Sequence, residues 1–169
     1  LQELTELSRM EEIRRLHPEI RLVLTTASGT EGGFPAGTKT EADARKLAAC
    51  LAQTVRDYGF DGLDVDWEYP TTDGDPSERH AHTVLLKALR EELDKLEGRH
   101  TLSIAAGCKT WYFEITELAQ SVQYLDYVNL MTYDINANCP YTMHHACPYP
   151  MATDKTAEGS AAENIEVFH

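Results

Sequence analysis

Residues 61–70 read DGLDVDWEYP and are the stretch of sequence that decides the fold. Acidic and apolar residues alternate here, which predicts a β-strand whose successive side chains point to opposite faces. One face then carries three acids, and the other carries Leu63, Val65 and Trp67. The acids are Asp64, Asp66 and Glu68. Because like charges a few ångströms apart disfavour ionisation, we expect at least one of the three to share or keep its proton.

Two other interpretations of the three acids are open from the residues alone. The first is a strand with its acids in solvent, although parallel strands are normally buried on both faces. The second is a Mg²⁺ site of the kind found in phosphoryl-transfer enzymes, because aspartates two residues apart on a strand supply the oxygen ligands that Mg²⁺ prefers. A functional use of the cluster is favoured, because a protein bears such repulsion chiefly where it uses it.

Outward from residues 61–70, the chain alternates between helix and strand. Thr40 is a suitable N-cap and Gly59 a suitable stop for the helix that precedes the acidic strand. The helices are expected over 1–16, 40–58, 75–98, 115–123 and 159–168, and the strands over 21–26, 60–70, 101–106 and 127–132, with a Gly-rich loop over 28–37. This order predicts an α/β fold with parallel strands joined by helical crossovers.

The string DGLDVDWEYP resembles the D-x-x-D-x-D-x-E signature of glycoside hydrolase family 18, the retaining chitinases, on the fourth strand of their barrel. All four acids match, and Trp67, Tyr69 and Pro70 match the chitinase form of the signature. Residues 128–134 (VNLMTYD) resemble the sixth-strand motif, and residues 21–29 (RLVLTTASG) look like the third-strand segment with departures at 25–27. The resemblance implies a (β/α)8 TIM-barrel type of fold. About four βα units, strands three to six, lie within residues 1–169, so this chain is expected to be a partial catalytic domain.

The resemblance also implies a reaction: the retaining hydrolysis of β-1,4-linked N-acetylglucosamine polymers (chitin or chito-oligosaccharides) by substrate-assisted catalysis. Glu68 is implied as the acid/base that protonates the leaving oxygen and later activates water. Asp66 is implied to orient the acetamido group and to stabilise the oxazolinium intermediate, and Asp64 to share a proton with Asp66. Tyr133 is implied to hold the acetamido oxygen in position.

Further candidates for substrate binding come from the matched segments and from the ends of the strands. Asp134 and Tyr69 are implied by the matched motifs, and Met131 shares a strand face with Tyr133 by alternation. Trp111 follows a predicted strand at the end that faces a barrel's active site, so it is a candidate for stacking on a sugar ring, with core packing equally open. Asp61 lies off the acidic face and is interpreted as structural. His144 and His145 are interpreted as loop residues rather than metal ligands, because adjacent residues do not readily converge on one metal, and His80 and His82 are treated with the same caution. No metal or other cofactor is expected.

Two related functions remain as alternatives to a chitinase. One is a non-catalytic chitinase-like lectin that binds oligosaccharides, which the presence of Glu68 disfavours because catalysis needs a positioned acid. The other is an endo-β-N-acetylglucosaminidase acting on glycoproteins, which residues 67–70 (WEYP) disfavour.

The overall composition limits the partners. The formal net charge of −13, from 28 acidic and 15 basic residues, disfavours nucleic acid and anionic membranes as partners. A neutral polysaccharide fits this balance better. No apolar run is long enough for a membrane span, and no signal peptide is expected in the chain, which lacks an initiator Met. The substrate class suggests an extracellular, secreted protein.

Two features concern association and cross-linking. An open sheet of four strands has unpaired edges, so self-association is expected if the barrel is truly incomplete. Cys139 and Cys147 lie eight residues apart, and they either close a small disulfide loop in an oxidising compartment or remain thiols.

Overall fold

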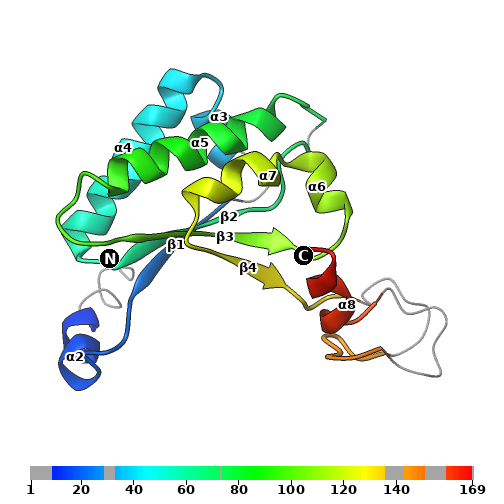
Figure 1. The fold of residues 1–169 in the computed structure, drawn as a ribbon. Coiled ribbons are helices and arrows are strands. Elements are labelled where there is room, and N and C mark those ends of the chain that lie inside the picture. The colour runs from blue at the N-terminus through cyan, green and yellow to red at the C-terminus, as the bar shows by residue number, and fades with distance from the viewer. Residues whose placement is uncertain (1–8, 29–32, 73, 136–142, 151–158, 169) are drawn as a thin grey trace.

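The computed structural model describes residues 9–28, 33–72, 74–135, 143–150 and 159–168, and shows four parallel strands in the order β1-β2-β3-β4 (Figure 1). The strands are β1 (Val23–Ser28), β2 (Gly62–Trp67), β3 (Thr101–Gly107) and β4 (Tyr127–Met131). The helices are α2 (Met10–Leu16), α3 (Gly33–Gly37), α4 (Glu41–Tyr58), α5 (Glu78–Leu93), α6 (Trp111–Ile115), α7 (Leu118–Ser121), the 3-10 turn η1 (Val122–Tyr124) and α8 (Ala161–Glu166). Parallel neighbours joined through helices are what consecutive units of a (β/α)8 barrel look like.

Local signals in the sequence set the helix that leads into the acidic strand. The Thr40 side chain accepts a hydrogen bond from the Asp43 N–H at 3.1 Å, which caps α4 as predicted. Gly59 ends the helix with φ 67°, a conformation that a residue without Cβ adopts at little cost. The chain therefore turns directly from α4 into β2.

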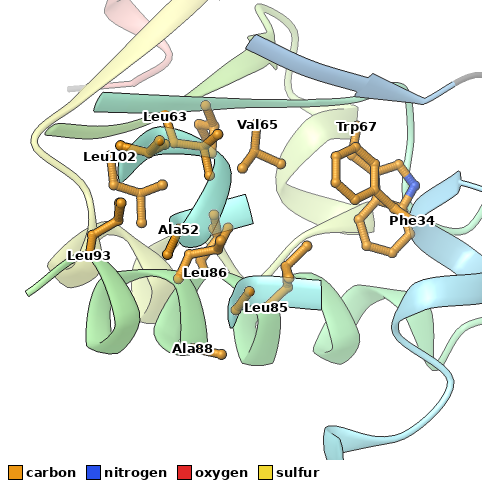
Figure 2. Close-up of a cluster of buried hydrophobic side chains, with 14 of the residues drawn as sticks. Phe34, Ala52, Leu63, Val65, Trp67, Leu85, Leu86, Ala88, Leu93 and Leu102 are labelled. Carbon is orange, nitrogen blue, oxygen red and sulfur yellow. The ribbon is translucent and has the colours of Figure 1, made fainter. Parts of the chain in front are cut away.

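One face of the sheet packs against α4, α5 and α7, and Figure 2 shows the apolar side chains between them. From β2, the side chains of Leu63, Val65 and Trp67 point into this layer and are at most 3% exposed. The ring of Phe34 stacks on Trp67 with centroids 5.2 Å apart. The alternation predicted within residues 60–70 is confirmed over Gly62–Trp67, and it leaves Asp64 and Asp66 on the sheet face turned away from these helices. The expected strand is shorter than predicted, and Glu68 follows its end.

Several element boundaries differ from the sequence expectation. The Gly-rich loop contains the short helix α3, because buried Phe34 anchors that segment to Trp67. The helix expected over 115–123 is instead α6, α7 and η1 in succession, and it begins earlier, at Trp111. The helix expected from Asp75 begins at Glu78, because the Asp75 carboxylate accepts hydrogen bonds from the N–H and hydroxyl of Ser77 in a turn before the helix. The same helix ends at Leu93 rather than near Gly98.

Within the described residues, no helix combines the length and apolar character that crossing a membrane requires. The N-terminal part of the helix expected over 1–16 lies outside the described residues, and α2 is its described portion.

Asp61, which precedes β2, ties the strand to the N-terminal segment. Its carboxylate accepts hydrogen bonds from the Leu22 N–H at 2.7 Å and from the Arg14 guanidinium at 3.0 Å. Partial burial acts to raise the pKa of Asp61, but these two donors outweigh it and hold the pKa below its usual value. The structural interpretation of Asp61 is consistent with these contacts.

Replacing Asp61 by Asn is expected to lower the free energy of unfolding by about 1–2 kcal/mol, the usual cost of weakening hydrogen bonds to a charged group. Urea denaturation at neutral pH measures this change. The control is Asp57→Asn at an exposed position of α4, where a change within about 0.5 kcal/mol is expected. Equal effects of the two substitutions would contradict the anchoring role of Asp61.

Candidate active site

The centre of the site is the acidic face of β2. Asp64 is 7% exposed, Asp66 is half-buried and Glu68 is exposed, so the three carboxylates run from the interior toward the carboxyl end of the strand. That end is where barrel enzymes of this architecture place their chemistry. The depth of the three groups differs, and each has a different electrostatic environment.

Asp64 is held by side chains from three neighbouring strands. Its Oδ1 accepts hydrogen bonds from the Ser103 hydroxyl at 2.5 Å and from the Asn129 amide at 3.0 Å. Its Oδ2 is 3.5 Å from the Thr25 hydroxyl. Thr25, Asp64 and Ser103 are paired across β1, β2 and β3, so they lie at one level of the sheet. The sheet register therefore supplies the donors of Asp64.

Asp66 lies next along the same face, with a different environment. Its Oδ1 is buried and has no hydrogen-bond partner among the described residues. Burial, and after it the negative charges of Glu68 and Asp64, raise the pKa of Asp66. The direction of this shift agrees with the expectation that like charges in the acidic row disfavour ionisation, and the retained proton stays a prediction.

Glu68 lies at the end of the acidic row, where its side chain reaches a pocket of about 180 Å³. The peptide bond between Glu68 and Tyr69 is cis. Burial, followed by a hydrogen bond to Glu68 and the charge of that carboxylate, raises the pKa of the Tyr69 phenol. The Tyr69 hydroxyl therefore stays protonated at neutral pH and can donate to Glu68.

The pocket brings together six of the eight candidate site residues from the sequence. They are Glu68, Tyr69, Trp111, Met131, Tyr133 and Asp134. Asp64 and Asp66 do not line the pocket and lie deeper along β2. The pocket also includes residues that sequence reasoning missed, namely Gly107, Cys108, Lys109 and Ile135. The end of β3, which carries most of them, has no polar pattern that could have marked it.

An aromatic wall forms one side of this pocket. The ring of Tyr69 meets Trp111 edge-on with centroids 4.8 Å apart, and Tyr112 lies behind them at 1% exposure. A Cβ on Gly107 would come within 2.7 Å of the Trp111 ring, so only glycine lets the indole lie against the end of β3. Trp111 is 37% exposed and lines the pocket, whereas Tyr112 belongs to the core.

The segment after β4 carries Tyr133 and Asp134, and both contact His145. The His145 ring stacks on Tyr133 with centroids 6.0 Å apart and a 14° angle, and its Nδ1 is 2.9 Å from the Asp134 carboxylate. Asp134 has φ 52°. His145 is in a loop, as expected, but its contacts with two candidate site residues were not anticipated, because no pattern links residues eleven positions apart in a loop.

Burial, followed by the charges of Glu68, Asp66 and Asp134, raises the pKa of Tyr133. Its phenol is thereby kept as a hydrogen-bond donor.

No group of three or more His, Cys, Asp or Glu side chains in the described ranges is placed to hold a metal ion, and this includes the acidic face of β2. The possible pairing of Cys139 with Cys147 falls outside the described residues, because Cys139 is not among them.

A second hollow, of about 450 Å³, lies between β4, α7 and α8. Its lining is apolar: Phe113, Leu118, Ala119, Val122, Val128, Leu130, Ile165 and Phe168. Although it is larger than the pocket at Glu68, it offers no titratable or nucleophilic side chain, so the acidic pocket is the candidate active site.

Comparison with known proteins gives a consistent result. Residues 1–166 match the family model of glycosyl hydrolases family 18. Chitinase A1 of Niallia circulans is 28% identical over 174 residues, which cover 96% of this chain and 25% of that protein. A solved family 18 N-acetylglucosaminidase from Paenibacillus barengoltzii superposes with a TM-score of 0.84 and 34% identity, covering 96% of this chain and 50% of that one.

The chitinase ChiW from Paenibacillus sp. str. FPU-7, a cell-surface-expressed multi-modular enzyme, gives a TM-score of 0.86 and 30% identity over 96% of this chain and 20% of its own. The chain thus spans only a quarter to a half of the length of chitinase A1 and the N-acetylglucosaminidase. The comparisons confirm both the family resemblance and the barrel type of fold, while the roles of single residues stay predictions.

Proposed function

The chain belongs to glycosyl hydrolase family 18, and from this premise we propose that the protein hydrolyses β-1,4 links between N-acetylglucosamine units in chitin or chito-oligosaccharides. The observation that carries the proposal is the graded acidic row that starts on β2 and ends just after it, with exposed Glu68 in a pocket that also contains Tyr133 and Asp134. A glycosidic bond placed in this pocket would have a carboxyl group within its reach as proton donor.

The mechanism we propose uses the substrate's own acetamido oxygen as nucleophile, so the protein supplies no covalent nucleophile. Glu68 protonates the leaving oxygen, and the anomeric carbon is attacked by the acetamido oxygen to give an oxazolinium ion. Water then opens this ion after losing a proton to Glu68, and the configuration at the anomeric carbon is retained.

The remaining candidates hold the reacting groups. Asp66 orients the acetamido group and stabilises the positive intermediate, and Asp64 exchanges a proton with it. Tyr133 donates its hydroxyl to the acetamido oxygen, a role that fits the raised pKa of its phenol. Trp111, Met131 and Asp134 contact the sugars on the sides of the pocket, and Tyr69 holds Glu68.

The N-acetyl group is the chemical requirement that tests this mechanism. We expect the full-length protein to cleave a fully N-acetylated chito-oligosaccharide with retention of the anomeric configuration. Proton NMR of the newly formed anomer measures this outcome. The fully deacetylated glucosamine oligomer of the same length is expected to remain intact, because it lacks the nucleophile. Equal cleavage of both oligomers, or release of the inverted anomer, would overturn the mechanism.

The same experiment separates the alternatives. Binding of the N-acetylated oligomer without cleavage would indicate a lectin, and cleavage of a glycoprotein glycan in preference to the oligomer would indicate an endo-β-N-acetylglucosaminidase. Turnover that survives a chelator would remove the Mg²⁺-dependent reading of the acidic row.

We further propose that the protein works outside the cell, because chitin is an extracellular substrate for most enzymes that digest it. The cell-surface expression of ChiW, one of its similar structures, supports this location.

A further inference from the structure

We propose that His145 is a positioning residue that holds residues 133–135 in place at the edge of the pocket. His145 itself does not line the pocket at Glu68, whereas all three residues of that segment do. Any effect of His145 on a bound sugar would therefore pass through them. The inference rests on the proposed function, because the part of the pocket that it positions is a part that contacts the substrate.

His145 contacts each of the three residues in a different way. Its imidazole stacks on the Tyr133 ring with centroids 6.0 Å apart and a 14° angle between the planes. Its Nδ1 lies 2.9 Å from the Asp134 carboxylate, and its backbone carbonyl accepts a hydrogen bond from the Ile135 N–H at 3.3 Å. An ionised carboxylate can only accept, so Nδ1 is the donor and carries the proton. One loop residue thus restrains two side chains and one peptide group.

The segment needs such restraints because of its backbone and its exposure. Asp134 has φ 52°, a left-handed conformation that residues with a Cβ rarely adopt. Tyr133 is 50% exposed and the Asp134 side chain is 67% exposed, so packing does little to select their rotamers. Lys109, just after β3, donates to the Ile135 carbonyl at 3.3 Å and ties the main chain from the other side. The stack and the Nδ1 hydrogen bond add the restraint on the side chains that packing does not supply.

The contacts of His145 are expected to matter for geometry and little for stability. The side chains of His145 and Asp134 are both mostly exposed, and exposed pairs of this kind contribute little to the free energy of unfolding. Catalysis is more sensitive, because a displacement of about 1 Å in the catalytic geometry can cost about 10²-fold in rate. Removing the contacts is therefore expected to lower activity while the fold stays intact.

The first test is the position of the His145 proton in the full-length protein labelled with ¹⁵N at histidine, with the NMR signal assigned by His145→Phe. At a pH that keeps the ring neutral, the proton is expected on Nδ1, because the Asp134 carboxylate accepts from it. In Asp134→Ala it is expected on Nε2, the nitrogen that a free neutral imidazole prefers to protonate. A wild-type proton on Nε2 would overturn the proposal. The measurement needs no turnover, so its outcome is independent of the proposed hydrolysis.

The second test separates the stack from the hydrogen bond by their effects on kcat/KM for the N-acetylated oligomer. His145→Phe keeps a ring and removes the donor, and kcat/KM is expected to fall about tenfold. His145→Asn keeps an N–H donor near the position of Nδ1 and removes the ring. It is expected to stay within about threefold of the wild type, because hydrogen bonds to an ionised carboxylate are the stronger contacts. Equal losses in the two variants would contradict positioning through the hydrogen bond.

A double-mutant cycle shows whether His145 acts through Asp134. In the Asp134→Ala background, His145→Phe is expected to change kcat/KM by less than about twofold, because the acceptor is already gone. A loss as large as in the wild-type background would overturn the proposal.

The matched control is His17→Phe, which changes another exposed histidine beside a carboxylate, that of Glu19 at 3.5 Å, in the segment between α2 and β1. Its kcat/KM is expected to equal that of the wild type. All these variants are expected to melt near the wild-type temperature, because both pairs are exposed. A large drop in the melting temperature of His145→Phe alone would assign a structural role to His145 and count against positioning.

Discussion

Glu68→Gln is expected to lower kcat for hydrolysis of an N-acetylated chito-oligosaccharide by about 10²–10⁴-fold in the full-length protein, the usual contribution of a positioned general acid/base. Gln keeps the shape of the side chain and its ability to bond to Tyr69, but it can neither give a proton to the leaving oxygen nor take one from water. The dissociation constant for the oligomer is expected to stay within a few fold, because the rest of the pocket is unchanged. Steady-state kinetics and calorimetry measure the two quantities.

The matched control for this experiment is Glu114→Gln, which makes the same chemical change at an exposed position of α6 outside the pocket lining. Its kcat is expected to equal that of the wild type. Glu68→Gln retaining more than about a tenth of the wild-type kcat would assign the acid/base role to another group. Loss of binding together with turnover would instead indicate that Glu68 holds the substrate.

The second large effect concerns stability at low pH, and its origin is His82 in α5. This side chain is 1% exposed, lies edge-on to Trp67, and its Nδ1 has no partner among the described residues. Burial lowers the pKa of His82 to about 4 from an ordinary value of 6.5. Between about pH 4 and pH 6.5, His82 is therefore protonated in the unfolded chain and neutral in the folded chain.

This difference in proton binding makes the folded protein less stable at low pH. The free energy of unfolding is unaffected by His82 above about pH 6.5, and it falls as the pH is lowered toward the folded pKa near 4. Between pH 7.5 and pH 4.5 this one group is expected to remove about 2.5 kcal/mol. In His82→Leu, which fills the site with an apolar side chain, that part of the pH dependence is expected to disappear.

Denaturant unfolding at the two pH values measures the effect as a difference between wild type and variant, so that the carboxyl groups common to both cancel. His80→Gln, in the same helix but with an exposed side chain, is expected to keep the pH dependence of the wild type. If wild type and His82→Leu lose the same free energy of unfolding, His82 is protonated in the folded protein and the burial argument is wrong.

How far the sequence predicted this protein depends on whether the signal was local. The existence of β2 within residues 60–70 and the helix between Thr40 and Gly59 were predictable because alternation and caps are encoded in neighbouring residues. The helix α3 was not, because Gly33, Pro35 and Gly37 are typical of a loop and only the distant Trp67 gives Phe34 a partner. Tertiary contact overrode the local preference there.

Among the residues of the candidate site, too, only those with a local sequence signal were predictable. The pocket gathers the candidates from the ends of β2 and β4 because parallel strands bring their carboxyl ends together. The donors of Asp64, and the contact of His145 with Asp134, were out of reach because they depend on strand register and on a loop path. Neither the strand register nor the path of the loop produces a periodic pattern in the sequence.

The alternation of β2 has one further consequence. A slip of β2 by a single residue would turn Asp64 and Asp66 toward α4 and α5 and expose Leu63, Val65 and Trp67 to water. Burying even one unpaired charge costs several kcal/mol, a large share of the stability of a typical domain. The slipped register is therefore much less stable than the native register, and the chain is expected to fold into the native one. The acidic side chains of the candidate site therefore also help to specify the register of the sheet.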